Sequence, residues 1–176
     1  MVSEKITSVP TNTAGVYCLF DLDGTAAYAG KSSDLRTRLR QHFIRQDSSA
    51  ASYGRLDLWD IWFLQWWETE DQHEAEQALL AEYQPYLNFD AEYMKTQPES
   101  PIHTDEPDGR IELMTEEEAQ FRSQPYNRSK QKLEHISRML DKIKLADHGD
   151  ATRATVEEHH QILENHLMEF LGTDES

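Results

Sequence analysis

The sequence predicts an α+β fold in its first half, followed by a helical extension. Two short β-prone runs joined by an Asp-Gly turn come first, and an aromatic-rich run that favours a third strand follows them. Apolar residues at helical spacing lie between and after these runs, and helical spacing alone is found toward the C-terminus. A chain of 176 residues, 38% of them hydrophobic, suits one modest domain with an appendage.

The first two strands are predicted to form a hairpin. Residues 15–21 (GVYCLFD) and 26–30 (AAYAG) favour strands, and the Asp-Gly pair between them is typical of a tight turn. A loop of two or four residues pairs Tyr17 with Gly30 and brings Tyr28 beside Tyr17 on the same face of the sheet. A loop of three or five residues would put the two tyrosines on opposite faces, so this geometry depends on the loop.

A helix is expected directly after the hairpin. Leu35, Leu39 and Phe43 recur at helical spacing, and Ser33 or Asp34 precedes them as a cap. Arg38 and His42 of this helix then lie one turn apart along one border of its buried face.

The rest of the first half is predicted to contain one strand and one helix. The run at 58–67 (LWDIWFLQWW) favours a strand that is buried on both faces, and a helix is expected over 72–83, ended by Pro85. Residues 91–114 are acidic and contain several prolines, so we expect an exposed linker there.

Three helices are expected in the C-terminal part. Thr115 and Glu118 match a capping box at the start of a short helix that ends near Pro125. Two longer helices with narrow apolar seams follow, and a short connection around Gly149 would let them fold back as an antiparallel hairpin. Alternatively, one seam pairs with a second protomer or another protein. The seam residues are Leu133, Ile136, Leu140, Ile143, Val156, His160, Leu163, Leu167 and Phe170.

The acidic composition has two local exceptions. The formal net charge is −16, which argues against a nucleic-acid partner because phosphate binding needs a basic surface. Residues 31–45 nevertheless contain five Lys or Arg against one Asp, and residues 122–144 contain seven against two acids. These segments leave room for local contact with nucleic acid.

Membrane insertion, secretion and thiol chemistry are disfavoured. No apolar run approaches the length of a membrane helix, and the N-terminus MVSEKITSVP lacks the basic start and apolar core of a signal peptide. We therefore expect a cytoplasmic protein. The single cysteine, Cys18, excludes an intrachain disulfide and a thiolate-rich zinc site.

A series of motifs lies in order along the first 90 residues. It consists of GVY at 15–17, YAG at 28–30, SDLRTRLRQH at 33–42, Glu76 and Asn88. This series resembles the GIY-YIG nuclease superfamily, although Val16 and Ala29 replace the isoleucines of the family's name. The second half of the chain resembles no family.

The resemblance implies a three-stranded antiparallel sheet flanked by helices, with a catalytic surface on one sheet face. It also implies cleavage of DNA phosphodiester bonds with Mg²⁺ or Mn²⁺ as cofactor. The implied catalytic residues are Tyr17, Tyr28, Arg38, His42 and Glu76, of which Glu76 is the metal ligand and either tyrosine could be the general base. Gly15, Gly30 and Asn88 would orient the site, and Lys31, Arg36, Arg40 and Arg45 would contact DNA.

Taken together, the chain is expected to consist of a catalytic module (1–90), the linker (91–114) and a helical extension (115–176). One alternative is a noncatalytic nucleic-acid or protein-binding module that keeps the same fold. In another, the C-terminal hairpin is the main functional part and docks into a protein complex.

Aromatic and basic residues outside the motifs allow two interpretations each. The four tryptophans (Trp59, Trp62, Trp66 and Trp67) are expected mainly in the core, although an exposed one could stack on a base. The basic segment 128–144 is either a solvated helix face or a DNA contact. The histidines at 159, 160 and 166 lack the spacing of a zinc site.

Overall fold

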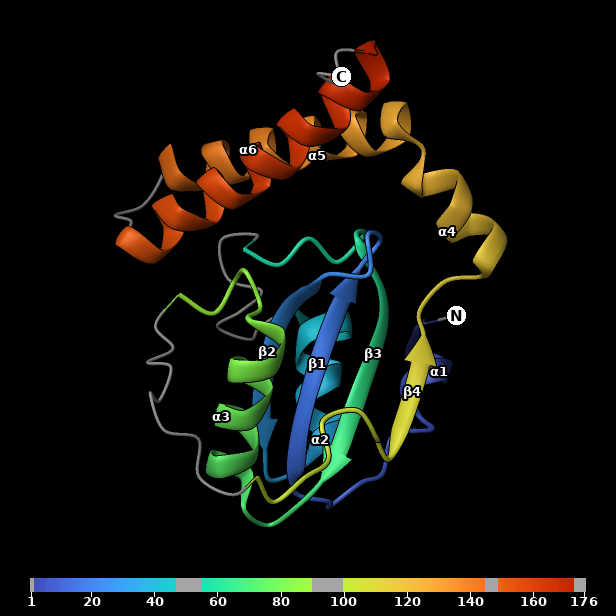
Figure 1. Cartoon of the computed structure of the whole chain (residues 1–176), viewed down its shortest axis with the longest axis vertical. Helices are drawn as coiled ribbons and strands as arrows, with labels where there is room; N and C mark the ends of the chain where they lie inside the picture. The colour runs from blue at the N-terminus through green and yellow to red at the C-terminus, as the bar shows by residue number, and fades with distance from the viewer. Residues whose placement is uncertain (1, 47–54, 90–99, 145–148, 173–176) are drawn as a thin grey trace.

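A four-stranded antiparallel sheet forms the centre of the protein, with the strand order β2-β1-β3-β4 (Figure 1). The computed structural model describes residues 2–46, 55–89, 100–144 and 149–172. The strands are β1 (Gly15–Asp21), β2 (Ala26–Ser32), β3 (Ile61–Glu68) and β4 (Gly109–Glu112). The helices are α1 (Val2–Ile6), α2 (Leu35–Arg40), the π-helix η1 (Gln41–Arg45), α3 (Gln72–Tyr83), α4 (Glu116–Ser123), α5 (Pro125–Lys144) and α6 (Asp150–Leu171). The α+β class is as predicted.

The sheet has four strands where three were expected, because β4 forms within the segment assigned to the linker. This strand pairs with the outer edge of β3. A Cβ atom at Gly109 would lie 2.0 Å from the Trp66 indole, so the close pairing requires glycine. Ile111 and Leu113 of this segment are buried in the core. Four residues next to prolines and acids carry almost no periodic signal, and the three-strand prediction was therefore wrong. Residues 91–99 of the expected linker lie outside the described residues.

The pairing of β1 with β2 has the register that brings two tyrosines together. Tyr17 pairs with Gly30 and Leu19 pairs with Tyr28, and the register shifts only beyond Leu19, toward the loop. Because this bulge lies on the loop side of both tyrosines, it leaves their diagonal arrangement intact. The conditional prediction of a shared face is therefore confirmed.

Helices α2 and α3 cover opposite faces of the sheet (Figure 1). α2 begins after Asp34, whose carboxylate accepts a backbone N–H of the first turn at 3.1 Å, as the predicted cap requires. Its Leu35 and Leu39 pack on one face of the sheet, while Leu79 of α3 packs on the other. β3 contributes side chains to both faces, as its aromatic run predicted, although it begins at Ile61 rather than at residue 58.

The C-terminal helices α5 and α6 pack side by side as a hairpin across one end of the sheet (Figure 1). The contact between α5 and α6 agrees with the predicted hairpin, whose connection at 145–148 lies outside the described residues. Pairing with a second protomer stays a prediction. α4 begins after Thr115, whose hydroxyl accepts the Glu118 backbone N–H at 3.2 Å. In the part of the chain that the structure describes, every helix is too short or too polar to cross a membrane.

The face that α5 turns toward the sheet is charged. Arg128 and Lys132 are fully buried, whereas the predicted seam residues Leu133 and Leu140 are each 52% exposed. The seam prediction was wrong for these two leucines and for His160 and Phe170 of α6, which are also exposed. The basic face of α5 is buried, not solvated, at Arg128 and Lys132. The reason is that the loops at this end of the sheet are acidic, and buried carboxylates must be paired with cations.

Four aspartates surround the two buried cations, and the most distant contact joins Asp21 Oδ2 to Arg128 Nη2 at 3.6 Å. Arg128 Nη1 lies 2.7 Å from Asp23 Oδ1, and its Nη2 donates to Asp60 Oδ2 at 3.1 Å. Lys132 Nζ lies 2.5 Å from Asp60 Oδ2 and 3.3 Å from Asp57 Oδ2. The hairpin is therefore attached to the sheet by a shared network of ion pairs.

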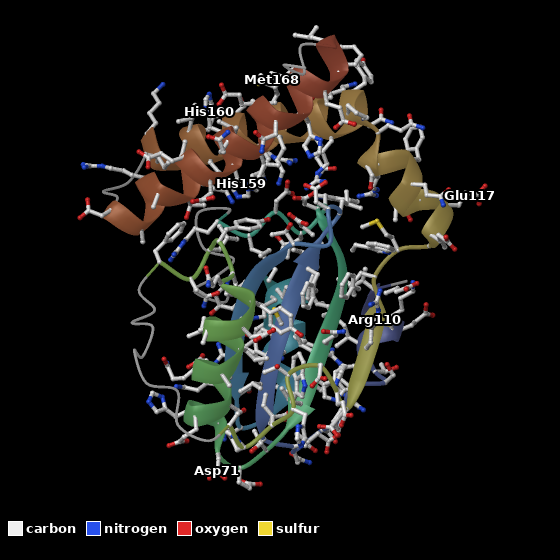
Figure 2. The ribbon with its side chains drawn as sticks, viewed as in Figure 1. Asp71, Arg110, Glu117, His159, His160 and Met168 are labelled. Atoms are coloured by element: carbon white, nitrogen blue, oxygen red, sulfur yellow. The ribbon has the colours of Figure 1, made fainter. Side chains whose placement is uncertain are left out.

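Histidines of α6 extend this interface. His159 Nε2 lies 2.9 Å from the Arg55 carbonyl oxygen, and its Nδ1 lies 3.3 Å from Lys132 Nζ. Burial, and then the charge of Lys132, lower the pKa of His159 to about 3, so this imidazole is neutral at physiological pH. Figure 2 shows His159 on the side of α6 that faces the sheet and His160 on the far side. His166 lies 3.2 Å from an aspartate of the same network.

Replacing Lys132 by methionine is expected to destabilise the protein strongly. The variant leaves Asp57 and Asp60 buried without the cation they share, and breaking a buried ion pair costs about 3–5 kcal/mol. Lys130→Met is the matched control, because Lys130 is exposed on the same helix and its loss should change the free energy of unfolding by less than about 0.5 kcal/mol. Urea unfolding followed by circular dichroism measures both variants. Equal stabilities would contradict the role of the network.

Candidate active site

Three aromatic rings meet on the α2 side of the sheet. Tyr17 from β1 and Tyr28 from β2 have ring centroids 6.3 Å apart, and the His42 ring lies 5.4 Å from Tyr17 and 5.7 Å from Tyr28. Tyr17 Oη lies 2.5 Å from His42 Nε2. Tyr17 and His42 are each 1% exposed, whereas Tyr28 is half-buried. Tyr28 is therefore the tyrosine that solvent and substrate can reach more easily.

A change of helix type places His42 in this cluster. α2 is followed at Gln41 by the wider π-helix η1, which ends at Arg45. The next residue, Gln46, has a left-handed φ of 55°. A regular α-helix would put His42 at the border of the buried face beside Arg38, as the sequence predicted. The structure instead buries His42 completely and leaves Arg38 half-buried.

Two glycines make room for the site. A Cβ atom at Gly30 would lie 2.6 Å from the Tyr17 hydroxyl oxygen and 3.1 Å from the Tyr28 ring. A Cβ atom at Gly15 would lie 2.2 Å from the Trp67 carbonyl oxygen, which is backbone and cannot move aside. Any larger residue at either position would push the paired strands or the tyrosines apart.

Burial sets the protonation of the aromatic cluster. Burial, and then the neighbouring Tyr28, raise the pKa of Tyr17 well above its usual value. Burial, and then the charge of Arg38, lower the pKa of His42 to about 4. At neutral pH the imidazole is therefore uncharged, and its Nε2 can accept the hydroxyl hydrogen of Tyr17.

The arginines of α2 and η1 differ in what they can reach. Arg38 lies close enough to the cluster that its charge opposes the rise in pKa that burial gives both tyrosines, and it contributes to the low pKa of His42. Arg36 points elsewhere, since its Nε donates to the Val9 carbonyl oxygen at 2.6 Å. Arg40 and Arg45 are exposed. Of the four, only Arg38 belongs to the centre of the site.

Glu76 approaches from the other side of the edge strand β2. It lies on α3, and its Oε2 is 2.8 Å from Lys31 Nζ, which in turn is 3.2 Å from His73 Nδ1. The carboxylate is near enough to raise the pKa of both Tyr17 and Tyr28. The site therefore spans the edge strand β2, with the aromatic cluster on one side and the carboxylate on the other.

Asn88 holds the outer edge of β2 beside Tyr28. Its Oδ1 accepts the Ala29 backbone N–H and its Nδ2 donates to the Ala29 carbonyl oxygen, both at 2.9 Å. An edge strand presents unpaired backbone groups, and this amide satisfies both of those at Ala29. The contact fixes the backbone on which Tyr28 is carried.

One residue near the site had no signal in the sequence. The Arg55 guanidinium lies 6.0 Å from the Phe89 ring centroid, and its charge opposes the rise in pKa that burial gives Tyr28. Its backbone carbonyl contacts His159 of α6. Arg55 belongs to none of the motifs, so only its place in the folded chain connects it to Tyr28.

The protein side chains at the site suit a divalent metal ion that takes its remaining ligands from water and from the bound phosphate. Among the described residues no group of three His, Cys, Asp or Glu side chains is arranged to hold a metal ion, and Glu76 is the carboxylate whose charge acts on both tyrosines. Mg²⁺ commonly binds through one or two carboxylates together with water and substrate phosphate. Glu76 alone at the strand edge is therefore enough to hold such an ion, provided that the ion pair between Lys31 and Glu76 opens.

Comparison with known families assigns the domain that contains this site. Residues 13–89 match the family model of the GIY-YIG catalytic domain, and this range includes all of the residues that form the site. The first half of the chain therefore carries a GIY-YIG domain, as the motifs indicated.

Among curated proteins, the same region is similar to several called UvrABC system protein C. Those of Caldicellulosiruptor saccharolyticus and Geotalea daltonii are 37% and 33% identical to it, each over 90 residues, and that of Oenococcus oeni is 25% identical over 113 residues. The alignments cover 49%, 48% and 64% of this chain but only 15%, 14% and 18% of the relatives. The chain thus spans less than a fifth of the length of each. No solved structure gives a significant match.

The imidazole of His42 is expected to titrate near pH 4. Arg38→Ala removes the second cause of this low pKa and should move the midpoint upward, whereas Arg40→Ala changes an exposed residue of the same helix and should leave it in place. Titration of the ring nitrogens by ¹H–¹⁵N NMR measures the midpoint in all three proteins. A wild-type midpoint near the usual 6.5 would show that His42 is not buried in the core.

Proposed function

We propose that this protein is a divalent-metal-dependent DNA endonuclease that hydrolyses phosphodiester bonds. The observation that carries the proposal is the convergence of Tyr17, Tyr28, Arg38, His42 and Glu76 at one edge of the sheet. Each of these residues comes from a different element, and all lie within a domain whose family is catalytic. Phosphodiester hydrolysis needs a base, a cation near the phosphate and a compensating positive side chain, and the set supplies a candidate for each.

Arg38 and Glu76 are proposed to provide the electrostatic part of the reaction. The planar guanidinium of Arg38 can pair with two nonbridging phosphate oxygens at once. Glu76 would hold Mg²⁺ or Mn²⁺, which supplies Lewis-acid stabilisation of the phosphate charge when bound. Lys31 compensates the Glu76 carboxylate in the free protein, and the phosphate of an arriving DNA strand offers Lys31 another anion to bind.

Tyr28 is the proposed general base. It is half-buried, whereas the Tyr17 hydroxyl lies in the core against His42. Burial, and then the charge of Glu76, raise the pKa of Tyr28, while two nearby arginines lower it. Neutralising the Glu76 carboxylate removes one cause that keeps the phenol protonated, so the side chain becomes a better acceptor for a proton from water. Tyr17 and His42 then act as positioning residues that hold the Tyr28 ring.

Arg40 and Arg45 are the proposed DNA contacts on the surface of α2 and η1. Both are exposed, so they can follow a phosphate backbone. Arg36 and Lys31, which the motif comparison placed in the same group, are engaged with the Val9 carbonyl and with Glu76. Their contribution to DNA binding should therefore be smaller than that of the two exposed arginines.

A noncatalytic DNA-binding or protein-binding module is the second candidate, and one observation favours it. Lys31 Nζ lies 2.8 Å from Glu76 Oε2, in a position where a metal ligand would have to be free. If this ion pair is permanent, the domain keeps its fold but cannot bind a metal ion through Glu76. A cleavage assay separates the two candidates.

In the presence of Mg²⁺ or Mn²⁺ the purified protein is expected to cleave DNA. Supercoiled, branched and single-stranded DNA are the substrates, and gel electrophoresis measures the products. Glu76→Ala and Arg38→Ala should each reduce the rate by about 10²-fold or more, the typical effect of removing a charge stabiliser. Glu74→Ala is the matched control, since Glu74 is exposed on the first turn of the same helix as Glu76.

The same assay identifies a failure of the proposal. DNA binding by the wild type without any cleavage would favour the noncatalytic candidate. Cleavage by Glu76→Ala at the rate of Glu74→Ala would remove Glu76 from the mechanism.

The cleavage rate is expected to rise with pH over about pH 6 to 9, because the pKa of the proposed base lies above its usual value near 10 and the active phenolate fraction grows throughout this range. Tyr28→Phe should give a slow rate that no longer depends on pH. Tyr17→Phe should slow the reaction and keep the rise, and Tyr126→Phe, which changes an exposed tyrosine of α5, should do neither. A flat profile in Tyr17→Phe with a rise in Tyr28→Phe would assign the base to Tyr17. Initial cleavage rates of the wild type and the three variants, measured across this pH range, distinguish Tyr28 from Tyr17 as the general base.

A further inference from the structure

A pocket away from the aromatic cluster lies between the catalytic domain and α5, and we call it the Trp59 pocket. Gln46, which follows η1, lines this pocket together with Asp57 and Trp59 from the segment before β3. The α5 helix contributes His135, Arg138 and Lys142 to the lining. The pocket therefore combines an aromatic ring with basic side chains.

Trp59 differs from the other tryptophans in its exposure. Its side chain is 60% exposed, whereas Trp66 and Trp67 are 7% and 1% exposed in the core. Arg122 of α4 holds it in place, with the guanidinium 5.0 Å from the indole centroid and Nη1 donating to the Trp59 carbonyl oxygen at 3.1 Å. A large ring that is fixed in position and left open offers a stacking surface.

Arg138 and Lys142 supply the positive charge of the pocket. They lie one helical turn apart on α5, and neither forms an ion pair with a carboxylate of residues 2–46, 55–89, 100–144 or 149–172. Asp57 does not cancel them, because it is 2% exposed and its carboxylate contacts Lys132 at 3.3 Å and Gln131 at 3.2 Å. A local excess of positive charge thus remains in a chain of net charge −16.

We propose that the Trp59 pocket binds one nucleotide of a single DNA strand, with the base stacked on Trp59 and a phosphate held by Arg138 and Lys142. This proposal rests on the proposed function, since it names where the substrate strand is held outside the reaction centre. Proteins that bind single strands without sequence preference combine an aromatic ring, on which a base stacks, with neighbouring basic side chains that contact the phosphates. The Gln46 amide provides a hydrogen-bonding group at the same pocket for a base edge.

The position of the pocket agrees with a strand that continues to the reaction centre. Gln46 directly follows η1, the helix that carries His42, and exposed Arg45 precedes it. Leu56, another wall residue, packs in the same core cluster as Tyr17. A strand leaving the pocket along η1 would therefore pass Arg45 on its way to Tyr28.

Binding of a fluorescein-labelled oligothymidylate of about 15 nucleotides, measured by anisotropy with EDTA present, tests the proposal without cleavage. Trp59→Ala should weaken binding about fivefold or more, the lower limit for loss of one stacked base, and Trp59→Phe should restore most of the affinity. Arg138→Gln and Lys142→Gln should each reduce the slope of log affinity against log salt by about 0.7, the value for one phosphate contact on a single strand. Arg153→Gln, on the exposed surface of α6, should change neither quantity.

Three results would overturn the proposal. The first is unchanged affinity in Trp59→Ala when circular dichroism shows that the variant is folded. The second is a salt slope that stays the same in both basic-residue variants. The third is binding of thymidine monophosphate or inorganic phosphate as tightly as the oligonucleotide, which would mean a small-anion site.

The outcome can be told apart from that of the proposed function. If the wild type cuts no DNA but binds the oligonucleotide through Trp59, the pocket stands and the nuclease proposal falls. If it cuts DNA and Trp59→Ala alters neither affinity nor the KM for single-stranded DNA, the pocket proposal alone falls.

Discussion

The hydrogen bonding of β1 to both of its neighbours constrains everything that surrounds the site. Its pairing with β2 sets Tyr17 opposite Gly30 and diagonal to Tyr28, and its pairing with β3 brings Gly15 against the Trp67 carbonyl. A slip by one residue would turn Tyr17 toward α3 and bring a side chain into each space that now holds only a glycine hydrogen. The register is therefore enforced by steric exclusion as well as by hydrogen bonds.

The parts of the fold that followed from the sequence are those with strong local patterns. The hairpin has an Asp-Gly turn, and α3 has the predicted bounds from Gln72 to Tyr83. β4 and the docking of α5 did not follow, because both depend on distant partners. Arg128 is buried and pairs with aspartates that lie about 70 to 100 residues earlier in the chain. Ion pairs between residues so far apart produce no periodic pattern in the sequence.

The candidate site shows the same division. The motif spacing predicted Tyr17, Tyr28, Arg38 and Glu76 as site residues, and all four lie within the range that matches the GIY-YIG catalytic domain. Arg55 belongs to no motif and was not predicted. An exposed tryptophan was allowed, but the sequence did not single out Trp59, since nothing local distinguishes a tryptophan in the core from one on the surface. Trp59 is held by Arg122 of α4 and Arg55 contacts His159 of α6, and both helices lie outside the range 13–89 that matches the family model.

The ion pairs between the hairpin and the sheet have a consequence for protein engineering. The match to the GIY-YIG catalytic domain ends at residue 89, but the counter-ions of Asp57 and Asp60 lie on α5, and the outer edge of β3 is covered by β4. A fragment cut at that boundary would expose a strand edge to aggregation and bring unopposed carboxylates together. To transplant the domain into a fusion enzyme, one must carry the C-terminal helices along or first make those aspartates neutral.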